Sequence, residues 1–187
     1  MKKLFVILSV VCTFGLMAQV TSTSSIYDID NLIKHGNYAQ DLNQDRDKFV
    51  GTWKYQNGET TLIVKLEKKD RFKFILNELQ VFYQDAITVK YKLIKNGNVL
   101  FDNLNSSFPN EYTNDNNAFF LINSKTNELK GSILDKSTNT VGHLDIEYIN
   151  NNGLKFNLNG HYKHVPNNLT GTNDFELPLG DIQLTRI

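Results

Sequence analysis

The sequence predicts an all-β protein, an antiparallel up-and-down β-barrel of about 8–10 strands preceded by a short helix or polar leader. Three observations predict it. From Phe49 onward, apolar residues recur at every second position, which is typical of strands with one buried face. Asn-Gly pairs at 57–58, 96–97 and 152–153 are typical of two-residue hairpin turns. The last strand, Asp181–Ile187, carries Arg186 on its apolar side, where a neighbouring first strand can accommodate it.

The overall composition suits a single exported domain. The chain has 187 residues, enough for one domain with a sizeable core. It holds 20 basic and 20 acidic residues, so it lacks the concentrated positive charge that binds nucleic acids or anionic membranes. We therefore expect no nucleic-acid partner, and we expect a monomer.

Residues 1–18 have the form of a secretory signal peptide. Lys2 and Lys3 precede a short apolar run from Leu4 to Met17, and cleavage fits after Ala18. An uncleaved membrane anchor is the alternative. The only cysteine, Cys12, lies inside this segment, so the mature chain has no disulfide and no thiol ligand for a metal. The sequence thus predicts an exported protein of the periplasm, outer envelope or medium, with no membrane span after signal removal.

Residues 19–48 form a polar leader ahead of the barrel domain, residues 49–187. Apolar residues at helical spacing between Ile26 and Ile33 predict a short helix over Ile26–Lys34. This leader either caps the barrel or is a loose segment.

The expected strands are joined mainly by tight turns, including one at Lys69-Asp70. In order, they cover Phe49–Tyr55, Leu62–Leu66, Phe72–Phe74, Ile87–Leu93, Val99–Phe101, Ala118–Asn123, Glu128–Leu134, Leu144–Tyr148, Leu154–Leu158 and Asp181–Ile187. Two long connections remain, Asp102–Asn117 and Gly160–Gly180, and loops of such length are commonly functional or disordered.

Arg186 favours closure of the sheet into a barrel. It shares a face with Ile182 and Leu184, and an unpaired buried charge is very costly. Trp53 lies on the inward face of the first strand, where a guanidinium can stack on its indole. In the alternative, Arg186 extends into solvent near the end of the chain.

The stretch Phe49–Lys54 resembles the first strand of lipocalins and fatty-acid-binding proteins, which carries Gly-x-Trp, here Gly51 and Trp53. In that superfamily an arginine of the last strand packs over the tryptophan, and Arg186 stands at the matching place. The resemblance implies a lipocalin-like (calycin-like) barrel closed by these three residues. It does not extend to fatty-acid binding, because Asn57-Gly58 turns directly into the second strand without a helical lid, and the carboxylate-binding Arg-x-Tyr is not matched.

Most of the mature chain is also similar to a family of short exported proteins from Bacteroidota that has no known function. The residues that carry this resemblance are Phe49–Tyr55, Ile87–Leu104, Leu129–Ser132 and Phe175–Pro178. It implies a lineage and a location, and it supplies no catalytic residue.

Two groups of ionisable residues could carry chemistry. His143, Asp145 and Glu147 share one strand face, which a metal or an acid–base pair could use, but the pattern favours a solvated outer face opposite Leu144, Ile146 and Tyr148. His161 and His164 lie in the second long loop without further ligands nearby.

The pattern Asp41-x-Asn43-x-Asp45-x-Asp47 copies the start of a calcium loop. Arg46 replaces the glycine of the turn, and Thr52 replaces the closing glutamate. Neither this pattern nor the ionisable groups complete a site, so the sequence predicts no metal, no cofactor and no enzyme.

Two functions remain open. In the first, the barrel is a non-enzymatic binding module that holds a small hydrophobic ligand, with Phe72, Phe74, Tyr91, Phe156 and Leu158 lining its interior. In the second, the same side chains fill the barrel, and the protein is a structural or interaction protein of the envelope that contacts an envelope protein through its loops or leader.

Overall fold

The computed structural model describes residues 23–187 except 29, 31–32, 78–79, 112–119 and 164–174. The predicted signal peptide therefore lies outside the described residues. Within them, eight antiparallel strands close into a barrel, as the sequence predicts. They are β3 (Gly51–Asn57), β4 (Thr60–Asn77), β5 (Gln80–Lys95), β7 (Phe120–Lys125), β8 (Glu128–Asp135), β9 (Thr140–Asn150), β10 (Gly153–Lys163) and β11 (Gly180–Arg186).

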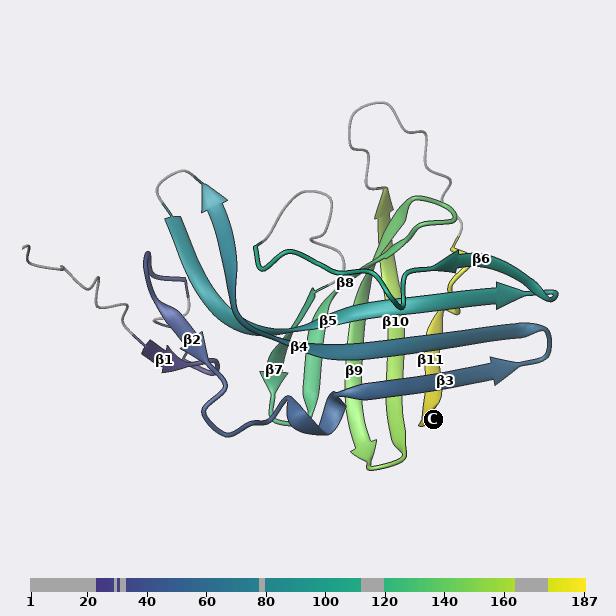
Figure 1. Ribbon diagram of the computed structural model, residues 1–187, viewed down its shortest axis with the longest axis horizontal. Coiled ribbons are helices and arrows are strands. Elements are labelled where there is room, and N and C mark those ends of the chain that lie inside the picture. Colours follow the sequence, from purple (N-terminus) through teal and green to yellow (C-terminus); the bar gives the residue numbers. More distant parts are fainter. Residues whose placement is uncertain (1–22, 29, 31–32, 78–79, 112–119, 164–174) are drawn as a thin grey trace, which may run out of the picture.

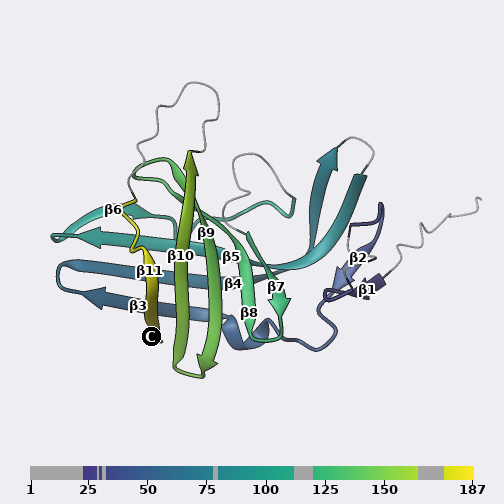
Figure 2. The same cartoon turned by 180° about the vertical axis from the view of Figure 1, so that it is seen from behind.

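The barrel closes at two places. β11 pairs with β3, as expected for the first and last strands, and β7 pairs back with β5 through Ile87–Leu121 and Thr88–Phe120. In Figures 1 and 2, β3–β5 run crosswise to β8–β10, so the barrel is flattened into two layers that cross each other.

The leader is part of the sheet. The strand β1 (Thr23–Ser25) pairs in parallel with β2 (Tyr38–Gln40), and β2 pairs in parallel with β5. A 3-10 helix, η1 (Asp47–Phe49), then leads into β3. The described part of the leader is thus hydrogen-bonded to the barrel strand β5. The helix expected over Ile26–Lys34 falls partly outside the described residues; Asp30 has helical backbone and turns lie on either side of it.

The hairpin turns are close to those expected. Asn96-Gly97 connects β5 to β6 (Asn98–Asp102), and both of its residues have positive φ, +52° and +76°, as in a type I′ turn. The other two turns are displaced by one residue, because Asn57 pairs with Thr60 and Gly153 pairs with Asn150. Their loop residues are therefore 58–59 and 151–152.

The turn expected at Lys69-Asp70 is wrong, because β4 continues through this point with a β-bulge. Lys69 pairs with Ala86 and Phe72 with Gln84, so that Asp70 and Arg71 together oppose the single residue Asp85. Arg71 takes the left-handed conformation that such a bulge requires, with φ of +51°. The hairpin of β4 and β5 consequently extends past the barrel and curls away from it in Figure 1.

The bulge also moves later side chains of β4 to the opposite face. Side chains alternate with a period of two, so one extra residue exchanges the two faces of the strand. Leu66 opposes Val89 inside the barrel, whereas Phe72 opposes Gln84 and packs with Ala86 in a separate cluster. The prediction that Phe72 and Phe74 line the barrel interior is therefore wrong.

Among the described residues, the barrel strands enclose a continuous apolar core. Twenty-two buried apolar residues form one continuous cluster that every barrel strand helps to build. Trp53, Tyr91 and Phe156 are fully buried in it, and Leu158 is 1% exposed. Phe49, expected in the first strand, lies in η1, where its ring closes one end of the core and meets Tyr148 edge-on at 5.9 Å.

Candidate functional site

Gly51, Trp53 and Arg186 meet where β3 and β11 pair. Arg186 opposes Trp53 in the register, and its guanidinium carbon lies 4.3 Å from the centroid of the indole ring. The guanidinium also donates hydrogen bonds to the carbonyls of Lys48, Val50 and Asn151, at 2.9–3.1 Å. Trp53 Nε1 donates to the carbonyl of Phe49 at 2.9 Å. Together the two side chains satisfy carbonyls around η1 and hold it against the first and last strands.

The geometry explains why glycine precedes this tryptophan. Gly51 has φ of +142°, and a Cβ at this position would lie 2.7 Å from Nη1 of Arg186. The backbone here is therefore open only to a residue without a side chain, which accounts physically for the Gly-x-Trp pattern.

We expect Gly51→Ala to lower the free energy of unfolding by about 1–3 kcal/mol, because the unfavourable φ remains and the guanidinium of Arg186 must shift away from the new methyl group. Urea unfolding measures the loss. In an Arg186→Ala background the loss should shrink, since only the backbone strain is left. Gly153→Ala is the matched control, because Gly153 does not have positive φ. An equal loss in both backgrounds would show that Arg186 does not depend on Gly51.

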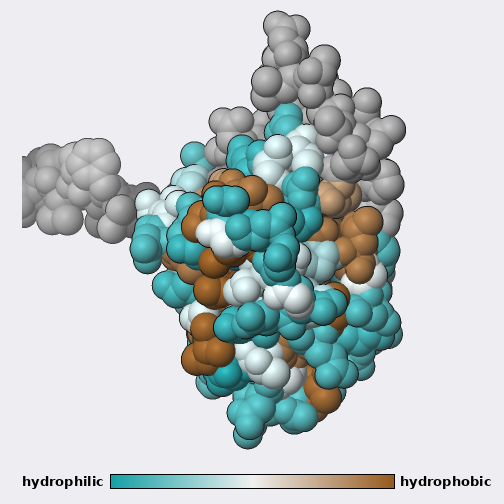
Figure 3. Space-filling model, turned by 90° about the vertical axis from the view of Figure 1, so that its right-hand side faces the viewer, coloured by the Kyte–Doolittle hydropathy of each residue, from teal (hydrophilic) through white to brown (hydrophobic). Residues whose placement is uncertain are grey.

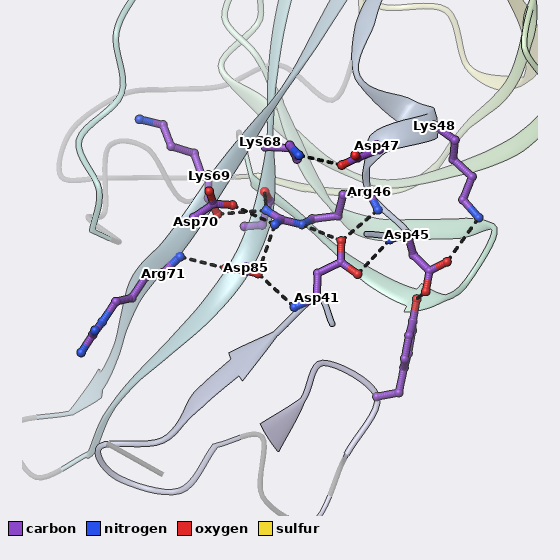
Figure 4. Close-up of polar contacts among 12 residues, drawn as sticks. Asp41, Asp45, Arg46, Asp47, Lys48, Lys68, Lys69, Asp70, Arg71 and Asp85 are labelled. Carbon is purple, nitrogen blue, oxygen red and sulfur yellow. Dashed lines mark hydrogen bonds and ion pairs between the residues drawn. The ribbon is translucent and has the colours of Figure 1, made fainter. Parts of the chain in front are cut away.

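A second constellation surrounds Arg46, in the segment between β2 and η1 (Figure 4). The guanidinium bonds Asp41 Oδ2 at 3.0 Å, Asp85 Oδ2 at 3.1 Å and Asp70 Oδ1 at 2.8 Å. Its Nη1 donates to the carbonyls of Ala86 and Lys69. The side chains of Arg46, Asp41 and Asp85 are 5%, 1% and 4% exposed, so this is a buried ion pair with two carboxylates.

Both buried carboxylates also accept hydrogen bonds from backbone amides, and Asp85 accepts one from a tyrosine hydroxyl. Asp41 accepts from the amides of Asp45 and Arg46. Asp85 accepts from the amides of Asp41 and Arg71 and from the hydroxyl of Tyr38, at 2.7–2.9 Å. The bulge residue Arg71 thus contributes its amide to the cluster. Burial alone would lower the pKa of Arg46, but the hydrogen bond to Asp70 and the charge of Asp85 outweigh it and raise that pKa.

This geometry uses the residues of the calcium-like pattern in another way. The Asp41 carboxylate accepts hydrogen bonds from three N–H donors. The positive charge beside it is that of the Arg46 guanidinium, where a calcium loop would hold its ion. Within the described parts of the chain, no three His, Cys, Asp or Glu side chains are placed to share a metal ion. The cluster joins the leader to the β4–β5 hairpin.

The stability of the protein should fall in alkaline solution. Burial and the hydrogen bond to Asp85 raise the pKa of Tyr38 above its ordinary value of about 10, and burial raises the pKa of Tyr91. The folded protein therefore keeps protons that the unfolded chain releases, so this stability is fully present below about pH 10 and is lost as the pH rises further. Urea unfolding between about pH 9 and pH 11 measures the decline. Tyr38→Phe should flatten it; identical curves for both proteins would contradict the assignment.

The remaining expected site residues lie in different parts of the structure. Tyr91, Phe156 and Leu158 belong to the same apolar core, and the Tyr91 hydroxyl donates to the carbonyl of Leu134 and accepts from the amide of Lys136. His143 and Glu147 lie on the exposed outer face of β9. His164 lies outside the described residues, and so does the side chain of His161.

Two concave areas lie near the C-terminal end of β3, one on each face of the strand. One, of about 130 Å³, lies between that hairpin and the segment after residue 174; it is lined by Tyr55, Asn57, Thr60, Lys95, Glu176, Leu177 and Pro178. The other, of about 410 Å³, lies over β3 and β11; it is lined by Lys54, Tyr55, Gln56, Gln183 and Thr185. Both include Tyr55.

Sequence reasoning missed the Arg46 cluster and these concave areas. The sequence carries two signals of the cluster: Arg46 stands where a calcium loop has glycine, and Asp85 lies within an apolar strand, where it needs a buried partner. Nothing in the local sequence marks the concave areas, because each brings together residues from distant segments.

Comparison with known proteins places the chain in a family. A profile of DUF6705, a family of unknown function, matches residues 1–186. No curated protein and no solved structure matches the chain at a significant level. No helix in the described residues is long and apolar enough to cross a membrane. Because the match covers residues 1–186 of 187, the chain belongs to the DUF6705 family.

Proposed function

We propose that this protein is an exported, non-enzymatic binding protein whose barrel is a rigid, filled scaffold and whose binding surface lies on the outside. The observation that carries the proposal is the continuous core of 22 buried apolar residues. An eight-stranded barrel is just wide enough either to be filled by side chains or to hold one small ligand, and the core supports the first arrangement.

The large aromatic residues support this choice most directly. Trp53, Tyr91 and Phe156 are fully buried, and Tyr91 spans from β5 to the end of β8 through its two hydrogen bonds. A hydrophobic ligand would have to displace these rings. Packing at the density of protein interiors makes such displacement expensive.

The buried ionisable groups support a non-enzymatic role. Arg46, Asp41 and Asp85 are engaged with one another and with backbone groups. Asp135, which is fully buried, accepts from the amides of Glu176 and Leu177 at 2.7 and 2.9 Å. Each of these groups holds two chain segments together, whereas a catalytic group needs access to substrate.

The signal-like residues 1–18 support export, and the cysteine-free chain that follows suits an oxidising compartment. The similarity of the mature chain to short exported proteins of Bacteroidota supports the same location in the envelope or medium.

Native mass spectrometry of the exported protein tests the proposal. We expect a monomer whose mass equals that of residues 19–187, with no additional small molecule, in both native and denaturing solution. A retained Met1–Ala18 would overturn export with signal cleavage. A co-purifying apolar molecule that is lost on denaturation would overturn the filled barrel and favour a ligand carrier.

A further inference from the structure

The two outer faces of the barrel carry opposite charge. Residues that alternate with the buried core positions point outward. On the outer face of β3–β6 these residues include five lysines and two carboxylates: Lys54, Lys65, Lys69, Lys90 and Lys92 with Glu67 and Asp102. On β8–β11 the described outward side chains include four carboxylates and two lysines: Glu128, Asp145, Glu147 and Asp181 with Lys130 and Lys155. The balanced charge of the whole sequence hides this separation.

Two of the lysines share one carboxylate. Lys65 and Lys90 oppose each other in the β4–β5 register, and both bind Glu67, with Nζ–Oε distances of 2.6 and 2.5 Å. The side chain of Lys90 is 9% exposed and that of Lys65 is 38% exposed. Glu67 neutralises only one of the two positive charges, so the excess charge is presented to solvent mainly through Lys65.

Aliphatic side chains lie among these lysines. Ile63 stands directly between Lys54 and Lys92 in the registers of β3, β4 and β5. In the next row Ile94 opposes Val99, which is 53% exposed. The ammonium of Lys54 makes no ion pair with any described residue. The outer face of β3–β6 is thus aliphatic between its lysines and positively charged at their ends.

We propose that the outer face of β3–β6 binds an anionic lipid surface. A bilayer with anionic headgroups is an extended negative plane, which attracts the lysine-rich face and repels the acidic face on β8–β11. The barrel therefore approaches it in one orientation. Lys54, Lys65 and Lys92 then meet headgroup phosphates, while Ile63 and Val99 contact the boundary of the acyl chains. This inference rests on the proposed function and names the partner of its outer surface.

Orientation matters because the mature chain as a whole is not positive. Loss of residues 1–18 removes Lys2 and Lys3, which leaves 18 basic and 20 acidic residues. A protein with this balance is not drawn to an anionic surface by its net charge. Attraction arises only within about 10 Å, the distance over which physiological salt screens charges, when the lysine-rich face is turned towards the lipid.

The residue types favour lipid over an acidic protein partner. All five cations of this face are lysines. Arginine is enriched in protein interfaces and pairs with carboxylates through two parallel hydrogen bonds, whereas lysine is depleted there. Lysine is a point charge, which suits headgroups in varied positions. Figure 3 looks onto the side where the hairpin tips lie in Figure 1, and its hydrophobic residues form separate spots among hydrophilic ones. We therefore expect reversible electrostatic attachment, without deep insertion.

Co-sedimentation of the mature exported protein with lipid vesicles tests the inference. The vesicles contain phosphatidylglycerol and phosphatidylcholine in equal amounts, or phosphatidylcholine alone. We expect binding to the mixed vesicles at about 20 mM salt, its loss at about 500 mM, and no binding to phosphatidylcholine. Lys54→Gln/Lys92→Gln should weaken the binding about 25-fold, which is about fivefold for each lysine. This variant should melt close to the parent, because the Lys92–Asp102 pair is accessible to solvent.

Lys130→Gln/Lys155→Gln is the matched control. It removes the same charge from the opposite face, at lysines that are 47% and 40% exposed, and it should weaken binding less than about threefold. Equal weakening by the two double variants would overturn the assignment to the β3–β6 face. Absence of binding to the mixed vesicles at low salt, or equal binding to phosphatidylcholine, would overturn the inference.

Soluble poly-glutamate separates lipid from an acidic polypeptide. At equal concentrations of negative charge it should compete only weakly with the mixed vesicles. Tighter binding to poly-glutamate than to the vesicles would assign this face to an acidic polypeptide and overturn the lipid surface. If native mass spectrometry finds a processed chain without an interior ligand, failure of the vesicle experiment removes this inference alone and leaves the proposed function intact.

Discussion

Arg46→Met should lower the free energy of unfolding by about 3–5 kcal/mol, because it leaves two buried carboxylates without their positive partner. Asp41 and Asp85 are 1% and 4% exposed and both depend on this guanidinium. The same change removes the bonds that Arg46 makes to the carbonyls of Lys69 and Ala86. Urea unfolding followed by circular dichroism measures the loss.

Lys68→Met is the matched control, because the Lys68–Asp47 pair lies in the same region with side chains 40% and 49% exposed. It should cost less than about 1 kcal/mol, as exposed ion pairs do. Adding Asp41→Asn and Asp85→Asn to Arg46→Met should recover part of the loss, since the unpaired charges are then gone. A loss for Arg46→Met no larger than that for Lys68→Met would show that the cluster does not hold the leader on the barrel.

Trp53→Ala should destabilise the protein by about 3–5 kcal/mol, because it empties the largest fully buried side chain of the core. It also removes the indole beneath Arg186 and the donor to the Phe49 carbonyl. Since small domains have a total stability of only about 5–15 kcal/mol, the variant should melt far below the parent protein. Differential scanning calorimetry and urea unfolding measure this.

A double-mutant cycle with Arg186→Ala separates the core from the closure. The stacking of the guanidinium on the indole should appear as a coupling of about 0.5–2 kcal/mol between the two positions. Trp53→Phe keeps an aromatic ring and should lie between the parent and Trp53→Ala. Additive losses, with no coupling, would mean that Arg186 and Trp53 contribute to stability independently despite their contact.

Much of this architecture follows from local physical chemistry. The alternation of apolar residues and the Asn-Gly turns predict the strands, because a half-buried strand and a two-residue turn each require a characteristic pattern among neighbouring residues. Arg186 indicates closure for a different reason: a charge on an apolar face requires a partner, and Trp53 lies on the inward face of the first strand. The computed structure confirms the pairing of these two strands.

The bulge in β4 could not be predicted in the same way. Lys69-Asp70-Arg71 is polar and interrupts an apolar alternation, so it looks like a turn. What keeps the strand going is Asp85, which binds the amide of Arg71 and the side chain of Arg46 from distant segments. Tertiary contacts thus decide between a turn and a bulge, and that decision moves Phe72 out of the barrel.

The groove over β3 and β11 is harder still to predict. Gln56 and Gln183 look like ordinary exposed strand residues in the sequence. They line one groove because β3 and β11 lie side by side in the barrel. That contact joins residues far apart in the chain, so it has no local sequence signal.

A titration with cis-parinaric acid, a fluorescent fatty acid that accepts energy from tryptophan, tests the filled barrel most directly. Trp53 is the only tryptophan and is fully buried in the barrel core, so a ligand in the interior would quench its emission. We predict no saturable quenching and no rise in probe emission up to about 10 μM, a concentration at which typical carriers of apolar ligands are largely occupied. Saturable one-to-one energy transfer from Trp53 would contradict a barrel filled by its own side chains.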